Sequence, residues 1–154
     1  MIAVVQRVKS ACVKVDGQIT GECGRGLAIL LGVAIGDTEK DADLLAEKIA
    51  KLRIFKDADG KMNLSVIDVG GSCVVVSQFT LLANYKHGNR PDFFGAESPN
   101  LAEPLYNYFA DKLSLLLGKE VGRGVFGADM MFEILNDGPV TIVMDSNILK
   151  TKKQ

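Results

Sequence analysis

The sequence has few of the side chains that most hydrolytic and metal-dependent sites use. It contains one histidine, His87, and three cysteines with no Cys-x-x-Cys spacing. A serine or cysteine nucleophile usually needs an imidazole to accept its proton, and a zinc site needs several His or Cys ligands. His87 stands between Lys86 and Gly88 in a polar stretch, which favours a solvated loop histidine. The sequence therefore predicts no metal, no cofactor and no Ser-His-Asp or Cys-His site.

Disulfide frameworks, leader segments and membrane spans are also unsupported. Cys12, Cys23 and Cys73 are odd in number and share no recognisable spacing, which indicates reduced, structural thiols. No apolar run approaches the ~18 residues of a membrane span, and residues 1–7 lack the pattern of a signal peptide. We expect a cytoplasmic protein without a membrane partner.

Size and charge limit the architecture and the partners. With 154 residues, 47% of them hydrophobic and 24% charged, the chain is expected to form one domain over residues 1–154. The net charge of -1 gives no global positive field to attract nucleic acid. An RNA partner would have to be held by a local patch or recognised at one end.

Hydrophobic patterning predicts an α/β unit with more strands than helices. The continuously apolar segment 26–33 is typical of a strand covered on both faces, and Asp16-Gly17 is a hairpin-turn signal. Three- and four-residue spacing predicts a helix over 38–53, capped by Asp37 or Thr38, and a second over 101–116 with Pro104 in its first turn or at a kink. Further strands are expected at 2–9, 11–15, 62–69, 73–79, 121–126, 130–135 and 140–144.

Two short segments carry the remaining chemistry: Ser-Gln-Phe-Thr-Leu at 77–81 and Asn-Asp-Gly-Pro-Val-Thr at 136–141. The first offers hydroxyls and backbone N–H groups at a strand end, and the second offers a Gly-Pro bond that can present bare carbonyls. Each alone fits an ordinary strand end or turn, since only about 5–6% of X-Pro bonds are cis. Neither supplies a nucleophile with its base. The pair suits a site that positions a substrate bringing its own reactive group.

In this order the two segments match the Ser-Gln-x-x-Leu and Asn-x-Gly-Pro-Val/Phe-Thr motifs of the D-aminoacyl-tRNA deacylases, the D-tyrosyl-tRNA(Tyr) deacylase family. Residues 1–8 with Gln6-Arg7-Val8, and the segments 61–65 and 88–91, resemble that family as well. The similarity spans essentially the whole chain, which is identified as a member.

The resemblance implies a compact β-barrel-like α/β fold with two main helices, assembled as a homodimer with two sites at the interface. It implies hydrolysis of the ester between a D-amino acid and the terminal adenosine at the acceptor end of tRNA. Gly138 and Pro139, joined by a cis bond, would enter the pocket from the other subunit, with Arg7 bracing them. The implied catalytic residues are Thr80, Ser77 and Phe79, and the implied substrate-binding residues are Gln78, Gly138, Pro139, Asn136 and Arg7.

The resemblance also implies how substrates are selected and cleaved. A wall of main-chain carbonyls against Cα leaves room for a hydrogen atom, so an L-residue clashes and a D-residue turns outward. Glycine would escape this exclusion, which makes glycyl-tRNA(Ala) a second substrate. The tRNA 2′-OH would assist attack on the ester, and backbone N–H groups near Phe79 and Thr80 would stabilise the oxyanion.

Two other functions stay open. One is a non-catalytic nucleic-acid-binding dimer, disfavoured by a sequence pI of about 5.8 and by no evident interleaving of aromatic and basic residues. The other is a serine esterase using Ser77, which lacks a base. Lys150, Lys152 and Lys153 form a basic tail that is expected to be solvated, with weak RNA contact as a second interpretation.

Overall fold

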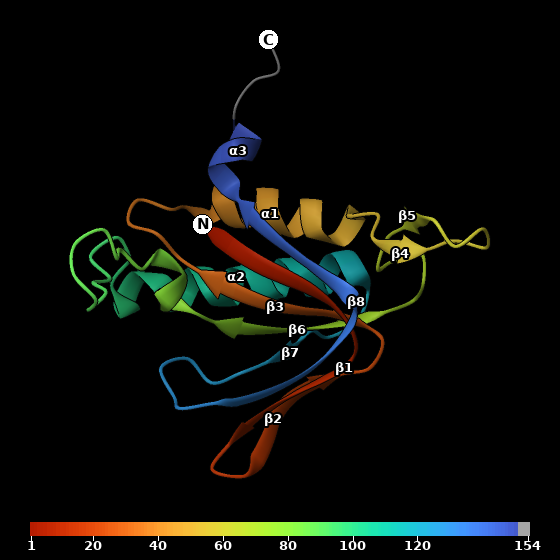
Figure 1. The fold of residues 1–154 in the computed structure, drawn as a ribbon, viewed down its shortest axis with the longest axis horizontal. Helices are drawn as coiled ribbons and strands as arrows, with labels where there is room; N and C mark the ends of the chain where they lie inside the picture. Colours follow the sequence, from red (N-terminus) through yellow and green to blue (C-terminus); the bar gives the residue numbers. More distant parts are fainter. Residues whose placement is uncertain (151–154) are drawn as a thin grey trace.

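The computed structural model describes residues 1–150 and contains one large sheet flanked by helices (Figure 1). The sheet order is β2-β1-β3-β6-β7, and β8 pairs with the other edge of β1. Its strands are β1 (Ile2–Val15), β2 (Gln18–Cys23), β3 (Gly26–Gly32), β6 (Ser72–Ser77), β7 (Gly122–Arg123) and β8 (Met131–Asp145). A small separate hairpin consists of β4 (Phe55–Lys56) and β5 (Met62–Leu64). The helices are α1 (Glu39–Lys51), α2 (Pro99–Leu117), α3 (Ser146–Lys150) and the 3-10 turn η1 (Phe79–Leu82).

The sheet curls until its two ends meet, which makes it a nearly closed barrel. Strands β2 and β7 lie side by side although they are not paired in the sheet order. A Cβ on Gly21 would lie 2.4 Å from the backbone nitrogen of Arg123, and one on Gly122 would lie 2.9 Å from the carbonyl oxygen of Glu22. Only glycine permits so close an approach of two backbones. The β-barrel-like α/β fold expected from the sequence is confirmed.

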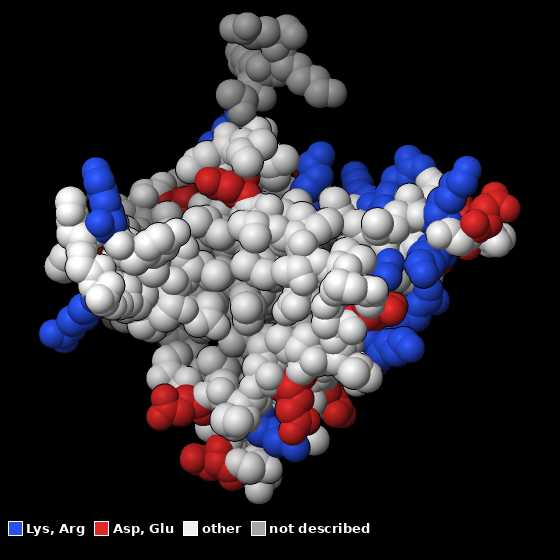
Figure 2. Space-filling view, viewed as in Figure 1, with Lys and Arg blue, Asp and Glu red and all other residues white. Residues whose placement is uncertain are grey.

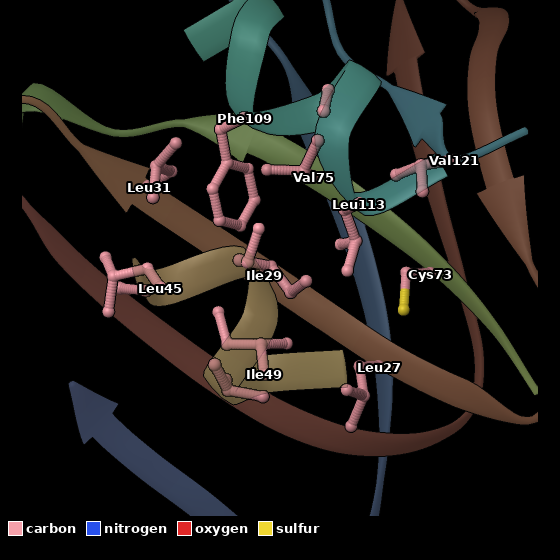
Figure 3. Packing of buried hydrophobic residues seen from close by; sticks show 14 of the residues in the cluster. Leu27, Ile29, Leu31, Leu45, Ile49, Cys73, Val75, Phe109, Leu113 and Val121 are labelled. Atoms are coloured by element: carbon pink, nitrogen blue, oxygen red, sulfur yellow. The ribbon is translucent and has the colours of Figure 1, made fainter. Parts of the chain in front are cut away.

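Two hydrophobic clusters lie on the two faces of the sheet. Helices α1 and α2 cover the outer face, where Ile29, Leu45, Ile49 and Phe109 pack together with full burial (Figure 3). The second cluster fills the inside of the barrel and includes Val8, Val13, Ala28, Val74 and Val76. Successive residues of β3 and β6 therefore point into different clusters, because side chains alternate along a strand. The prediction of a strand covered on both faces over 26–33 is confirmed.

Strand β1 is continuous where two strands were expected, and so is β8. Both run unbroken because they pair with each other along almost their whole length. Between the pairs Gln6–Thr141 and Val8–Asn136, two steps on β1 correspond to five on β8. The extra residues of β8 form a bulge at 137–140, and its tip, Gly138 and Pro139, is exposed. The sheet thus presents the Gly-Pro segment on its surface.

Other predictions need correction. The strand expected at 62–69 ends at Leu64, because Ser65 and Asp68 exchange side-chain to backbone hydrogen bonds of 2.8 and 3.1 Å that form a turn. The strand expected at 121–126 is only Gly122–Arg123, and α3 was not predicted. Pro104 lies inside α2, beyond its first turn, which excludes the first of the two positions expected for it. The N-cap of α1 is Thr38, as predicted, and its backbone N–H donates to Asp41 at 2.9 Å.

The C-terminal helix is tied to a buried carboxylate. Asp41 is 1% exposed, accepts a hydrogen bond from the Ser146 hydroxyl at 2.6 Å and pairs with Lys150. Burial acts to raise the pKa of Asp41, but hydrogen bonds from Lys150, Ser146 and Thr38 outweigh it and hold that pKa well below its ordinary value. Lys150 is thus a structural ion-pair partner instead of part of a solvated tail, while Lys152 and Lys153 lie outside the described residues.

None of the helices among residues 1–150 combines the length and apolar character needed to span a bilayer.

Candidate functional site

The segment 77–80 lies where β6 leaves the sheet. Ser77 is the last residue of β6, and the Gln78 backbone N–H donates to the Leu31 carbonyl at 2.8 Å, which keeps the chain beside β3. The 3-10 turn η1 then begins at Phe79. Both Phe79 and Thr80 are exposed, and the Thr80 hydroxyl accepts a hydrogen bond from the Gln78 side chain. The sequence therefore delivers these residues to the surface at a strand end, as expected.

Two backbone donors of this turn are unused. Within residues 1–150, the N–H groups of Phe79 and Thr80 have no hydrogen-bond partner, whereas those of Gln78 and Leu81 do. The first N–H groups of any helical turn lack an intrahelical acceptor. This turn therefore offers two adjacent donors at the surface, a suitable arrangement for a developing negative charge on a bound substrate.

A cavity of about 670 Å³ opens beside these donors. Ser77, Gln78 and Phe79 line one side of it, and the start of α2 with Pro99 and Ala102 lines another. Aromatic side chains supply much of its wall, and the rings of Phe79 and Phe93 meet edge to face at 5.1 Å. Several lining residues come from distant elements and belong to no motif in the sequence: Phe93, Tyr106, Phe126, Met130 and Phe132.

Tyr106 in the cavity wall and the buried cysteines outside it are not arranged as nucleophiles, and the carboxylates that line the cavity are those of Glu97 and Asp129. The Tyr106 hydroxyl donates to the Val75 carbonyl at 2.9 Å, and burial raises the pKa of Tyr106 to about 12. Burial also raises the pKa of the Cys23 thiol to about 11 and that of Cys73 to about 12, so both stay protonated at neutral pH. His87 is exposed in the loop after η1. No three His, Cys, Asp or Glu side chains gather as metal ligands within residues 1–150.

The second motif lies on the bulge of β8 and is tightly braced. The Asn136 amide donates to the carbonyls of Arg7 at 2.9 Å and Val140 at 3.1 Å, which closes the base of the bulge. Arg7, only 4% exposed, donates from Nε to the Asp137 carbonyl at 3.1 Å and from Nη1 to the Ile54 carbonyl at 2.7 Å. The bracing contact expected of Arg7 is therefore present. A charged donor holds such carbonyls more strongly than a neutral one.

The Gly138–Pro139 peptide bond is cis, the isomer that the sequence resemblance implied. Gly138 has φ +136°, in the region that favours glycine, and a Cβ there would lie 2.8 Å from Nη2 of Arg7. Neither Gly138 nor Pro139 lines the cavity beside Phe79. Within one chain the structure thus brings Ser77, Gln78 and Phe79 together and keeps the Gly-Pro segment apart from them.

Comparison with known proteins gives consistent results. The family model of D-Tyr-tRNA(Tyr) deacylase matches residues 4–145. A protein named D-aminoacyl-tRNA deacylase from Roseiflexus castenholzii is 55% identical over 97% of this chain and 95% of its own length. A solved structure named c-Myc DNA Unwinding Element Binding Protein is 42% identical, with a TM-score of 0.88 over 94% of this chain and 98% of that one. Another, described as a probable eukaryotic D-amino acid tRNA deacylase, is 15% identical with a TM-score of 0.79 over 93% and 97% of the two chains, and shows the shared fold alone.

Proposed function

This chain belongs to the D-Tyr-tRNA(Tyr) deacylase family, and on that premise we propose that it cleaves D-aminoacyl-tRNA with main-chain groups and the substrate's own hydroxyl. It is a hydrolase acting on the ester bond of aminoacyl-tRNA. The observation that carries the proposal is the pair of unused N–H groups at Phe79 and Thr80 beside the cavity. The substrate is a translation intermediate, so this work belongs in the cytoplasm.

Catalysis in this proposal requires no side-chain nucleophile. The ester carbonyl lies over the N–H groups of Phe79 and Thr80, which stabilise the oxyanion by about 3–4 kcal/mol for a well-placed donor. The 2′-OH of the terminal adenosine assists attack by a water molecule on the ester carbonyl carbon. The ester C–O bond then breaks, which releases the free D-amino acid, and the departing ribose oxygen of the tRNA takes up the proton that the water loses. Ser77 and the Thr80 hydroxyl serve as secondary helpers, and Gln78 contacts the substrate. The scarcity of imidazole bases in the chain is then no obstacle.

Selection by handedness requires a second copy of the chain. Gly138 and Pro139 lie exposed and apart from the cavity of their own chain, so we propose that they enter the cavity of a homodimer partner. The outward face of β8 supports this assembly, because Met131, Leu135 and Val143 are 72%, 57% and 71% exposed. Among residues 1–150, strand β8 pairs only with β1, which leaves its other edge available for association.

The carbonyls of Gly138 and Pro139 then face the substrate's amino group and Cα. A rigid wall there admits a hydrogen atom and rejects the side chain of an L-residue. Steric exclusion is needed because apolar pockets separate similar ligands by only ~1–3 kcal/mol. Glycine carries no side chain to exclude, so glycyl-tRNA(Ala) is a further proposed substrate.

The test measures deacylation of D- and L-tyrosyl-tRNA by the wild-type protein and by the Thr80→Ala variant. The wild-type protein is also given D-tyrosyl-tRNA with a 2′-deoxy terminal adenosine. We expect Thr80→Ala to keep substantial activity and the 2′-deoxy substrate to lose most of it. A folded, substrate-binding Thr80→Ala protein without any activity would instead establish a side-chain nucleophile and reject the proposal.

A second candidate, a non-catalytic nucleic-acid-binding protein, is favoured by two observations. One relative's name describes DNA binding. The other is the loop after η1, where the exposed Lys86 and Arg90 lie in sequence between Tyr85 and Phe94, whose side chains are 78% and 85% exposed. Release of free D-tyrosine over many turnovers, at enzyme concentrations far below the substrate, separates catalysis from binding.

A further inference from the structure

A group of exposed cations lies at one end of this acidic molecule. Figure 2 shows Lys and Arg side chains gathered over the end of α1 and the β4-β5 hairpin. In sequence, residues 48–61 carry five cations against two anions. Six exposed cations form this basic face: Arg25, Lys48, Lys51, Arg53, Lys56 and Lys61.

A small pocket lies within this face. Its volume is about 150 Å³, and Arg7, Arg25, Phe55, Lys56 and Asp137 line it. The guanidinium of Arg25 lies over the ring of Phe55 at 5.6 Å from its centroid, and that ring is 1% exposed. A cation stacked on an immobile ring has a defined position. The ring therefore holds Arg25 at a defined position beside the other residues that line the pocket.

The acidic groups nearby do not neutralise this site. Asp137 already faces Arg7, whose Nε lies 3.4 Å from its carboxylate. Asp57 accepts hydrogen bonds from the backbone N–H groups of Asp59 and Lys61, and the bond from Lys61 is the main reason why its pKa is lowered. Within residues 1–150, Arg25 and Lys56 have no ion-pair partner. Their charges are available to an external anion.

The pocket adjoins the second functional motif. Asp137 lines the pocket, and Gly138 and Pro139 follow it directly in the chain. In the proposed dimer this tip enters the partner's cavity, which would bring Arg25 and Lys56, through their shared pocket with Asp137, close to that cavity. An RNA strand whose ester lies in the partner's cavity would carry its phosphates past Arg25 and Lys56.

We propose that the basic face, centred on Arg25 and Lys56, binds the phosphate backbone of the tRNA acceptor stem. This inference rests on the proposed function and names the part of the substrate that is held outside the cavity. Phosphate contacts position an RNA duplex without reading its sequence, which suits an enzyme acting on many tRNAs. Each such contact also makes binding depend on salt concentration.

The test measures deacylation of D-tyrosyl-tRNA by the double variant Arg25→Gln/Lys56→Gln at several salt concentrations. We expect KM to rise about tenfold with kcat changed less than twofold, and the slope of log(1/KM) against log[salt] to fall by about one per lost contact. Hydrolysis of D-tyrosyl-adenosine, which has no stem, should be unaffected. Lys40→Gln, at the opposite end of α1 and also exposed, is the matched control and should behave as wild type.

Any of three results would overturn the inference. The double variant could keep the KM and the salt slope of the wild-type protein, or it could lose as much activity on D-tyrosyl-adenosine as on D-tyrosyl-tRNA. Inorganic phosphate could also displace tRNA as effectively as an RNA hairpin does at equal ionic strength. Failure of the wild-type protein to hydrolyse any aminoacyl-tRNA would reject the proposed function instead. Fluorescence anisotropy with uncharged tRNA then still tests the basic face, because it needs no catalysis.

Discussion

Replacing Gly138 by alanine tests whether the shape of the Gly-Pro bulge is required for function. Gly138 has φ +136°, a conformation that L-residues rarely adopt. The added Cβ would lie 2.8 Å from Nη2 of Arg7 and 3.0 Å from the backbone nitrogen of Val140, against the 3.4 Å at which ordinary contact begins. The Arg7 side chain has little room to yield, because it is buried and bonded to the carbonyls of Ile54 and Asp137.

The structure gives the size of the effect. Backbone strain at this φ costs about 1–3 kcal/mol. Complete loss of one charge-assisted hydrogen bond of Arg7 would add about 1.5–3 kcal/mol, and a weakened bond would add less. The bulge can relieve the crowding by moving a few tenths of an ångström. Since a misplacement of ~1 Å can cost about 100-fold in rate, we expect kcat/KM for D-tyrosyl-tRNA to fall about tenfold.

Gly60→Ala is the matched control, because Gly60 has φ +77° with no atom within 4 Å of the added Cβ. Urea denaturation should show that Gly138→Ala destabilises the protein by about 1–3 kcal/mol more than Gly60→Ala does. The rates of deacylation of D- and L-tyrosyl-tRNA, and their ratio, should differ from the wild-type values only in the Gly138→Ala variant. Equal stabilities of the two variants, together with an unaltered D/L ratio, would refute this account of the bulge.

Three further changes have defined outcomes. Arg7→Gln removes the charge that holds two carbonyls, so urea denaturation should show a free energy of unfolding lower by about 1.5–3 kcal/mol or more. Activity on D-tyrosyl-tRNA should fall as well. Wild-type values of both quantities would exclude the bracing role. Phe109→Ala empties the fully buried centre of the outer cluster and should cost about 3–5 kcal/mol of unfolding free energy, whereas a cost below 1 kcal/mol would mean that the core collapses around the gap. Asp41→Asn tests the buried ion pair through pH. Because the folded-state pKa of Asp41 lies below its ordinary value of 3.8, its contribution to stability is present above that pH and is lost as the pH falls toward the folded pKa. The melting temperature of the variant should therefore depend less on pH below about pH 4 than that of the wild-type protein. Identical acid profiles of the two proteins would contradict the assignment.

Local patterns were sufficient for much of the fold. The apolar stripe of Ala42, Leu45 and Ile49 predicted α1, and the run 26–33 predicted a strand buried on both faces, because each pattern is a direct consequence of helix or strand geometry. The predicted elements were wrong where the residues form a hydrogen-bonded turn instead of the expected strand. Residues 65–70 have the apolar content of a strand, yet the Ser65–Asp68 hydrogen bonds turn the chain there.

The candidate site divides in the same way. Segments 77–80 and 136–139 were found from their motifs, and the position of Ser77 at a strand end followed from the apolar residues before it. The aromatic wall of the cavity could not be found, since Phe93, Tyr106 and Phe126 come from a loop, a helix and a turn that meet only in the folded chain. The spacing of these residues in the sequence does not predict that they lie together.

The sequence by itself determined the chemical character of this protein: few imidazole and thiol groups, two motifs rich in backbone donors and acceptors, and membership of one enzyme family. The tertiary structure decided where those groups act. Pairing of β8 with β1 pushes Gly138 and Pro139 outward as a bulge, and the end of β6 leaves two N–H groups unpaired beside a cavity. It also brings Arg25 beside the cation-rich segment 48–61 of a chain whose net charge is -1, because charge totals are a property of composition whereas fields depend on position.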